Sequence, residues 1–302
     1  MPSPDESRAL RGSGERSRRD GGRVSRPPSD RDLEGRVAIV TGASRGVGAA
    51  LAVALAEAGV EVACAARATD TAPLPLPGTI DDTVRQITDA GGTAVAVPTN
   101  LAREEDVDAM VATTVERLGG VDILVNNAAV TFPGDLDLEM KRHDLVMAVN
   151  LRAPLVAARA AVPHMRARGG GAIVNVSSLA ALNYIPGLMA YGVSKIALEH
   201  LTVSLAAQLR SDGIAVNTFR IDVPVASEGF VANTPGLDRS DWEPTEVAAE
   251  GIVWLLRQPP SYTGRNVGMA ALRAEHGIMA SRSERAHHPS DAMVYDTPLQ
   301  LP

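Results

Sequence analysis

A tyrosine and a lysine four positions apart, Tyr191 and Lys195, are the residues whose types and spacing best suit acid–base chemistry. On a helix, this spacing places both side chains on one face. A free phenol, with a pKa near about 10, exchanges protons poorly at neutral pH, and a nearby ammonium lowers that pKa by favouring the phenolate. The pair therefore predicts a proton donor and the group that tunes it. An ordinary solvated helix face is the alternative that this spacing leaves open.

A glycine-rich turn lies between a predicted buried strand, 36–41, and a predicted helix that ends at Gly59. In a doubly wound fold, such a turn offers backbone N–H groups and a helix N-terminus to a pyrophosphate. Its spacing, Gly-x3-Gly-x-Gly, lacks the Gly-Lys-Ser/Thr ending of a P-loop, which disfavours a nucleotide triphosphatase. A tight structural turn is the alternative. The predicted cofactor contacts in this turn are Gly42, Ser44, Arg45, Gly46, Val47 and Gly48.

The end of the second predicted strand, 60–66, indicates which nicotinamide cofactor is bound. An acidic residue usually stands there when the ribose 2′-hydroxyl is bound, but this chain has Ala66 followed by Arg67. Arg45 in the glycine turn is a second cation. Because guanidinium groups bind phosphate strongly, the two arginines favour NADP(H), while NAD(H) stays possible. Two solvated surface arginines are the alternative interpretation.

Strands and helices alternate from residue 33 to residue 273, which predicts one α/β domain with a Rossmann-type, doubly wound parallel sheet of about seven strands. The predicted strands are 36–41, 60–66, 93–97, 121–126, 172–177, 215–221 and 266–270. The predicted helices are 47–58, 80–90, 103–118, 136–149, 151–167, 191–210 and 244–256. Residues 1–32, rich in Arg, Ser, Gly and Pro, are expected to be a disordered tail, and 274–302 a C-terminal tail.

Composition narrows the function classes. The 302 residues include 45% hydrophobic residues and carry a net charge of −7, which suits a globular domain and gives nucleic-acid binding no support. The single cysteine, Cys64, permits no internal disulfide and fits a reducing cytoplasm. The six histidines have no metal-binding spacing. Since no run reaches about 18 apolar residues, no membrane span is expected either.

Several motifs in order resemble the short-chain dehydrogenase/reductase family over roughly residues 35–270. They are the segment 41–48, the sequence Asn-Asn-Ala-Ala at 126–129, Asn150, Ser178 and Tyr191-x3-Lys195. The resemblance implies that Tyr191 exchanges a proton with the substrate oxygen and that Ser178 orients that oxygen. It also implies that Lys195 holds the nicotinamide ribose and lowers the tyrosine pKa, while Asn150 holds a water that links Lys195 to solvent.

The resemblance extends to further cofactor contacts and to some departures from the family pattern. The additional expected contacts are Asn100, Leu101, Asn126 and Ala128. Asn100 stands where the family usually has Asp, and Ile221-Asp222 replaces a Pro-Gly pair beside the nicotinamide. The proline-rich loop before Gly78 and the segment 220–222 look similar to a hydroxysteroid- or terpenoid-alcohol-dehydrogenase-like branch.

These observations together predict an NADP-dependent oxidoreductase for a carbonyl/alcohol pair. Residues 224–243 are expected to form a substrate lid, and Tyr184 and Phe230 to contact the substrate. The helices 151–167 and 191–210 are alanine-rich and suit close packing between subunits, and the family resemblance implies a homodimer or homotetramer. One alternative is a non-catalytic NADP-binding sensor or scaffold. Another is an enoyl reductase, which the Tyr–Lys spacing of four disfavours because those relatives place the two residues farther apart.

Overall fold

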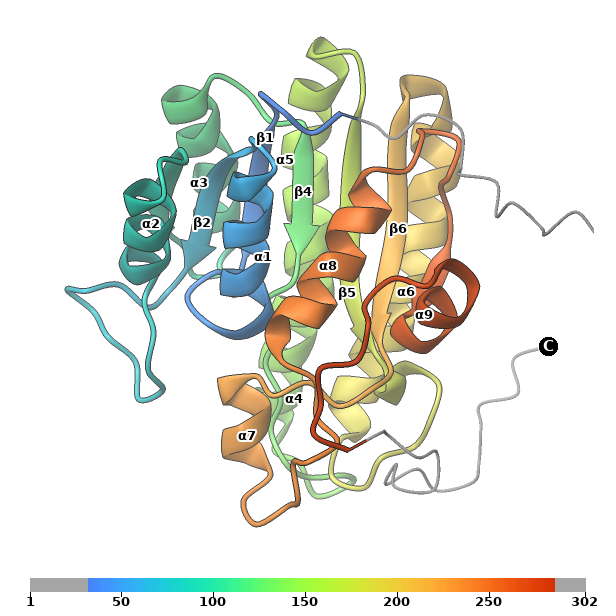
Figure 1. Cartoon of the computed structure of the whole chain (residues 1–302). Helices are drawn as coiled ribbons and strands as arrows, with labels where there is room; N and C mark the ends of the chain where they lie inside the picture. Colours follow the sequence, from blue (N-terminus) through green and yellow to red (C-terminus); the bar gives the residue numbers. More distant parts are fainter. Residues whose placement is uncertain (1–31, 286–302) are drawn as a thin grey trace, which may run out of the picture.

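The structure, a computed structural model, describes residues 32–285 and contains one parallel sheet in the order β3-β2-β1-β4-β5-β6-β7 (Figure 1). The direction of strand addition reverses between β1 and β4, and ligands of doubly wound sheets bind at such a reversal, beyond the carboxyl ends of the strands. The predicted Rossmann-type sheet is thereby confirmed. The strands are β1 (Val37–Thr41), β2 (Glu61–Ala66), β3 (Ala94–Pro98), β4 (Ile123–Asn126), β5 (Gly171–Ser178), β6 (Ile214–Ile221) and β7 (Asn266–Gly268).

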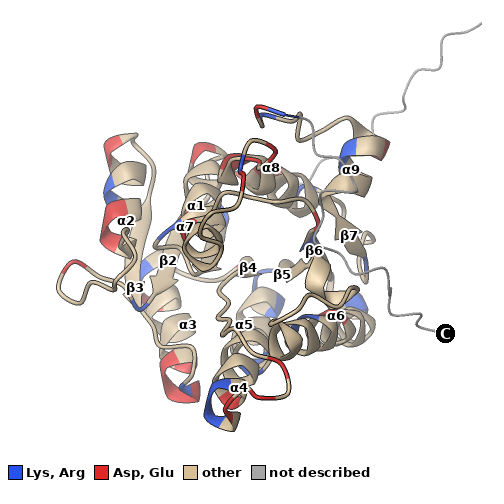
Figure 2. Ribbon diagram, turned by 90° about the horizontal axis from the view of Figure 1, so that it is seen from below, with Lys and Arg blue, Asp and Glu red and all other residues tan. Residues whose placement is uncertain are grey.

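Helices cover both faces of the sheet, which explains why the central strands are almost continuously apolar. One hydrophobic cluster joins the sheet to α1 (Gly46–Glu57), α2 (Ile80–Asp89) and α8 (Thr245–Leu256). A second cluster joins the opposite face to α3 (Glu104–Leu118), α5 (Ala153–Ala167) and α6 (Met189–Leu209). Figure 2 looks along the strands and shows these two helical layers on either side of the sheet.

A long helical stretch runs through α4 (Met140–Met147), a π-helical turn at Ala148–Arg152 and α5. By length and composition Met140–Ala167 could cross a membrane, but 56% of its most apolar window is buried inside the domain, as in a core helix. The predicted helix at 136–149 begins four residues late. The Asp135 carboxylate instead accepts hydrogen bonds from Gly187 N and from the Tyr184 hydroxyl, both at 2.9 Å, which holds this segment as a loop.

The C-terminal boundary predicted at residue 273 is too early. β7 ends at Gly268, and α9 (Met269–His276) begins there because the Asp222 carboxylate accepts a hydrogen bond from Ala270 N at 3.0 Å. The segment 277–285 then packs on the domain: Met279 is buried, and Arg282 N donates to the Glu243 carboxylate at 2.8 Å. Of the tails predicted at 1–32 and 274–302, residues 1–31 and 286–302 lie outside the described residues.

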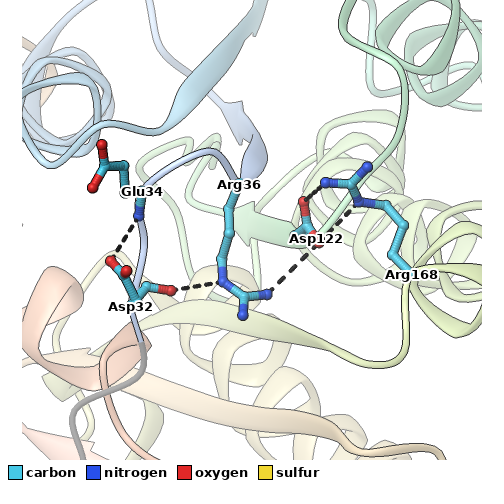
Figure 3. Close-up of a pocket in the computed structure, with 5 residues that line it drawn as sticks. All are labelled: Asp32, Glu34, Arg36, Asp122 and Arg168. Atoms are coloured by element: carbon cyan, nitrogen blue, oxygen red, sulfur yellow. Dashed lines mark hydrogen bonds and ion pairs between the residues drawn. The ribbon is translucent and has the colours of Figure 1, made fainter.

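A polar cluster fastens the edge of the sheet where the strands begin (Figure 3). The buried Asp122, which precedes β4, accepts a hydrogen bond from Val37 N at the start of β1, at 2.9 Å. Its other oxygen accepts from Arg168 Nε at 3.0 Å, and Arg36 Nη1 lies 3.7 Å away. The carboxylate thereby ties β1 to the C-terminal end of α5. Because this polar cluster lies where the strands begin, it is at the opposite edge of the sheet from the candidate site, which forms where the strands end.

Candidate active site

The glycine turn after β1 packs so closely against the end of β4 that side chains are excluded. A Cβ on Gly48 would lie 2.2 Å from the Gly42 carbonyl oxygen, and one on Gly42, whose φ is +72°, would lie 2.9 Å from Ala128 Cα. Asn127 fastens the start of this turn, since its Nδ2 donates a hydrogen bond to the Thr41 carbonyl at 2.9 Å. Backbone groups therefore form the surface of this turn, as binding of a pyrophosphate requires.

The N-terminus of α1 lies at that surface, and Ser227 and Glu228 of the segment 224–243 lie close to its first residue, Gly46. Its first turn carries no acidic residue, and its N-cap, Arg45, makes no side-chain capping bond. The positive end of the helix dipole and a nearby guanidinium are thus directed at the same place, which favours an anion. Ser44 lies beside them, largely buried, whereas the Val47 side chain packs into the core. The residues present therefore fit the phosphates of a dinucleotide.

Arg45 is held in place by the proline-rich loop. Its Nη2 donates to the Gly78 carbonyl at 2.9 Å, and its Nε is buried without a hydrogen-bond partner among residues 32–285. Burial lowers the pKa of Arg45, the nearby Glu228 carboxylate raises it, and the positive charge of Arg67 lowers it. Arg67 itself is exposed. Two like charges thus lie close together beside the turn, with one donor still unused, and this arrangement suits a phosphate.

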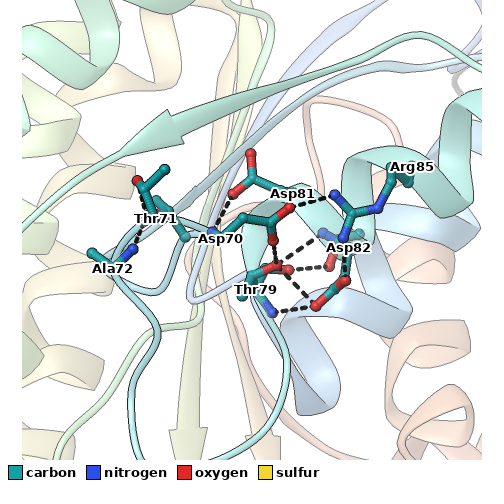
Figure 4. A network of polar contacts seen from close by, with 9 residues as sticks. Asp70, Thr71, Ala72, Thr79, Asp81, Asp82 and Arg85 are labelled. Carbon is teal, nitrogen blue, oxygen red and sulfur yellow. Dashed lines mark hydrogen bonds and ion pairs between the residues drawn. The ribbon is translucent and has the colours of Figure 1, made fainter.

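A network of polar contacts fixes the loop that carries Gly78 (Figure 4). Thr79 and Asp82 form a capping box at the start of α2, and Asp70 accepts from the Thr79 hydroxyl at 2.8 Å and from Arg85 Nη1 at 2.6 Å. Gly78, at φ +95°, approaches the glycine turn so closely that a Cβ would lie 2.4 Å from the Ser44 carbonyl oxygen. The network therefore determines where the Gly78 carbonyl meets Arg45.

Three of the four predicted catalytic side chains meet at the carboxyl end of β5. Ser178 is the last residue of β5, and its hydroxyl is hydrogen-bonded to the Tyr191 phenol in the first turn of α6. Gly192 permits this approach, because a Cβ there would lie 2.7 Å from the Ala180 carbonyl oxygen. Lys195 follows one turn later, with its Nζ 5.5 Å from the centre of the Tyr191 ring. The structure thus brings together a hydroxyl, a phenol and an ammonium.

The protonation equilibria of this group follow mainly from burial. Burial lowers the pKa of the Lys195 ammonium to about 8, and the Glu199 carboxylate opposes that shift. Lys195 Nζ donates to the Val176 carbonyl at 2.8 Å. Burial also raises the pKa of Tyr191, against the effect of the Ser178 hydrogen bond. This direction is opposite to the predicted one, because burial of the phenol outweighs the other influences on it.

Asn150 lies in the π-helical turn and is fully buried, and its side chain is hydrogen-bonded to Val130 and Ser194. Its Oδ1 accepts from Val130 N at 2.8 Å, and its Nδ2 donates to the Val130 carbonyl at 2.9 Å. The same Nδ2 also lies 3.0 Å from Ser194 Oγ, whose hydroxyl donates to the Tyr191 carbonyl. The side chain therefore links the π-helical turn to the catalytic helix through Ser194.

Of the remaining predicted cofactor contacts, Asn126, Asn100 and Leu101 have side chains that contact other parts of the protein, whereas Ala128 lies beside the glycine turn. Asn126 points away from the turn and donates to Asn175 Oδ1 at 2.8 Å, so its side chain fastens β4 to β5. Asn100 and Leu101 follow β3: Asn100 Oδ1 accepts from a backbone N–H two residues later, and Leu101 packs on the core. Ala128 N donates to Thr41 Oγ1 at 3.2 Å, which keeps its backbone beside the glycine turn.

The predicted lid, 224–243, is a loop whose two ends are hydrogen-bonded to each other. Val225 and Glu243 form a β-bridge, and the loop between them contains α7 (Glu228–Asn233). The predicted substrate contact Phe230 stacks on Trp242, with ring centres 4.6 Å apart. Figure 1 shows α7 below α1, and a Cβ on Gly46 would lie 3.1 Å from Ser227 Cβ, so the lid adjoins the glycine turn. Tyr184, the other predicted contact, is 48% exposed.

Sequence reasoning missed three residues that support the site. Asn127 braces the glycine turn, and Glu199 and Arg220 form a buried ion pair behind Lys195. Glu199 carries a signal that could have found it, since it lies four residues after Lys195 and hence on the same helix face. Arg220 lies between Phe219 and Ile221 near the end of β6, just before the place where the family pattern changes.

Comparisons with known proteins show which family the chain resembles. A family model described as short chain dehydrogenase matches residues 36–223. The chain is 36% identical over 217 residues to 2-(R)-hydroxypropyl-CoM dehydrogenase of Xanthobacter autotrophicus, a match that covers 66% of this chain and 84% of that protein. It is 31% identical over 256 residues to hydroxysteroid dehydrogenase-like protein 2 of Mus musculus, which covers 83% of this chain and only 51% of that protein.

A solved structure shows the same fold. A metagenomic short-chain oxidoreductase in complex with NADP superposes with a TM-score of 0.65 at 31% identity, covering 78% of this chain and 96% of that chain. The likeness to hydroxysteroid dehydrogenase-like protein 2 supports the predicted hydroxysteroid-dehydrogenase-like branch. The chain therefore belongs to the short-chain dehydrogenase/reductase family and is an oxidoreductase acting on CH–OH and C=O groups.

Proposed function

We propose that this protein is an NADP(H)-dependent oxidoreductase that interconverts a carbonyl compound and its alcohol, with Tyr191 as the acid–base group. One observation carries the proposal: the Ser178 hydroxyl, the Tyr191 phenol and the Lys195 ammonium converge at the carboxyl end of β5, the same edge of the sheet at which the glycine turn follows β1. A secondary alcohol/ketone pair is the preferred substrate class. The name of the Xanthobacter relative, a hydroxypropyl dehydrogenase, supports that class.

The roles of the side chains follow from their positions. The Ser178 and Tyr191 hydroxyls would hold the substrate oxygen between them, so that Tyr191 protonates it during reduction and removes its proton during oxidation. Bound NADP(H) supplies or accepts the hydride. Lys195, Gly42, Gly46 and Gly48 would hold the cofactor, and Tyr184 and Phe230 would line the substrate side. Asn150 would steady the catalytic helix through Ser194.

Support for NADP(H) over NAD(H) comes from charge. Arg45 and Arg67 influence each other electrostatically beside the turn, and the Arg45 Nε has no partner within residues 32–285. A 2′-phosphate would accept the missing hydrogen bond and add negative charge to that of Glu228 beside the two guanidinium groups. The NADP bound to the metagenomic relative is consistent with this preference.

Tyr191→Phe tests the catalytic proposal. We expect turnover of a ketone screened with NADPH to fall by about 10²–10⁴-fold, because the variant has no proton to transfer. NADPH binding, measured by fluorescence titration, is expected to persist. Tyr262→Phe is the matched control, since Tyr262 packs on Trp254 in the α8 region. Unchanged turnover in Tyr191→Phe would refute the assigned role, and a wild-type protein that binds NADPH without any turnover would favour a cofactor-binding sensor.

We also propose a homodimer or homotetramer in the cytoplasm. Large apolar side chains are exposed on the outer helices: Leu155 of α5 is 45% exposed, and Val193 and Val203 of α6 are 48% and 44% exposed. Isolated exposed side chains are common, but three on adjacent helices suit burial against a second copy. Light scattering on the purified protein measures the number of subunits.

A further inference from the structure

A buried ion pair between Glu199 and Arg220 lies one helical turn beyond Lys195. Glu199 follows Lys195 by one turn of α6 and is 2% exposed. Its Oε1 accepts from Arg220 Nε at 2.9 Å and its Oε2 from Arg220 Nη2 at 2.5 Å, which is a bidentate arrangement. Ser177, next to the predicted catalytic Ser178, donates its hydroxyl to Oε1 at 2.7 Å. The carboxylate thus joins the ends of β5 and β6 to the catalytic helix.

Stability alone gives little reason for an ion pair at this position. Removing two charges from water is costly, and well-packed apolar side chains of similar size commonly replace such pairs without loss of stability. Glu199 is instead the charged group that acts on the pKa of Lys195. Its position explains why Arg220 is found at the end of β6, just before Ile221-Asp222 departs from the family pattern. The pair is therefore a candidate for a role in the reaction.

We propose that Glu199 and Arg220 are positioning residues for Lys195: Glu199 keeps the buried lysine as an ammonium, and Arg220 fixes the carboxylate and moderates its charge. The consequence for catalysis rests on the function proposed above, but the effect on Lys195 does not. An ammonium can donate hydrogen bonds to ribose hydroxyls and favour the Tyr191 phenolate, whereas a neutral amine does both less well.

Among the groups described around Lys195, Glu199 is the negatively charged one that acts on its ammonium. Strand β5 contributes the Val176 carbonyl and the Ser177 and Ser178 hydroxyls, and has no ionisable side chain. Strand β6 contributes Arg220, whose charge also acts on Asp222 farther along. On α6 itself, Tyr191 faces Lys195. Helix α4 also packs on α6, and its His143 lies 3.5 Å from the neighbouring Asp144 carboxylate.

The composition of the chain makes the proposal directly measurable. Lysine occurs at only two positions, Lys141 and Lys195, and Lys141 is exposed on α4. Protein labelled with ¹³C at lysine Cε therefore gives two NMR signals whose shifts report the two ionisations. Lys141→Arg assigns them, and Lys141 is then the internal standard in every sample. The experiment needs neither cofactor nor substrate.

We expect the wild-type Lys195 signal to titrate near pH 8, in accord with its lowered pKa of about 8. Glu199→Gln should lower that midpoint by about one unit or more, a tenfold change in the ionisation constant, because it removes the anion and leaves Arg220 unpaired. Arg220→Gln should raise the midpoint, because it leaves the anion unopposed. The double variant should fall between Glu199→Gln and the wild type. Glu57→Gln, an exposed site on α1, should change nothing.

Opposite shifts from the two halves of one ion pair are the supporting result, since a purely structural pair would not produce them. Shifts in the same direction, or midpoints unchanged in both single variants, would overturn the proposal. Should either single variant fail to fold, the double variant, which leaves no buried charge unpaired, decides the matter by a midpoint below the wild type. If the shifts occur while the wild type shows no turnover, the proposed function fails and the assignment to Lys195 stands.

Discussion

At the scale of single residues, the proposed preference for NADP(H) rests on two cations in different surroundings. Arg45 is partly buried and fixed by the Gly78 carbonyl, whereas Arg67 is exposed. A charged hydrogen bond in the first setting is less screened by water than one in the second. The two arginines are therefore expected to contribute unequally to 2′-phosphate binding, although the sequence assigns them the same role.

Substitution of each arginine tests this. Arg45→Ala should weaken NADPH binding by about tenfold or more, and Arg67→Ala by less, with NADH binding changed little by either, since NADH has no 2′-phosphate. Fluorescence titration with both cofactors at one ionic strength measures these constants. Arg103→Ala removes a surface arginine paired with Glu105 and serves as the control. Equal losses for NADH and NADPH would show that Arg45 binds the shared pyrophosphate and does not select NADP(H).

At the scale of elements, the alternation of helices and strands was predictable because the 2.0 and 3.6 periodicities and the glycine punctuation are local. The misplaced boundaries depend on distant partners. The helix expected from 136 starts at Met140 because Gly187 and Tyr184, some fifty residues later, hold Asp135. The strand expected to reach 270 stops at Gly268 because Asp222 caps α9. Neither partner is apparent from the segment itself.

In the candidate site too, features that depend on local sequence were predictable and features that depend on distant partners were not. The motif spacing put Ser178 at a strand end and Tyr191 at a helix start, and both lie there, because that spacing reflects the fold, while their catalytic roles stay a prediction. The direction of the Asn126 side chain could not be predicted, since it depends on Asn175 in the adjacent strand. The direction of the Tyr191 pKa shift was predicted wrongly, because the degree of burial emerges only when α6 packs on the sheet.

The glycine turn gives an element-scale prediction. Gly48→Ala should unfold the protein at lower urea concentration, by roughly 2 kcal/mol or more, and abolish cofactor binding, because the new Cβ would lie 2.2 Å from the Gly42 carbonyl oxygen. Gly229→Ala in α7 is the matched control: no atom lies within 4 Å of its new Cβ, and its effect should be within about 0.5 kcal/mol. A Gly48→Ala protein with wild-type stability would contradict the observed closeness of the turn.

At the scale of the whole molecule, the C-terminal segment 277–285 connects the lid to the core. Glu243, at the base of the lid, accepts from Arg273 Nη2 at 2.8 Å and from Arg282 N, while Arg273 Nε also donates to the Met279 carbonyl at 2.7 Å. Met279 is 2% exposed and so close to α8 that a Cβ on Gly251 would lie 2.4 Å from its Sδ. The segment thereby anchors the C-terminal end of the lid, at Glu243, whereas α7 lies nearer the N-terminal end of the lid.

Met279→Ala tests whether this anchor supports the whole domain. Loss of a buried methionine side chain should lower the free energy of unfolding by about 2–5 kcal/mol, measured by urea denaturation. Met140→Ala, at a position that is 65% exposed, is the matched control and should change it by less than about 0.5 kcal/mol. Because Glu243 holds the lid base through this segment, Met279→Ala should also weaken the Phe230–Trp242 stack and shift the emission of Trp242, read in a Trp254→Phe background. A loss of stability with unchanged Trp242 emission would show that the segment supports the core but does not hold the lid.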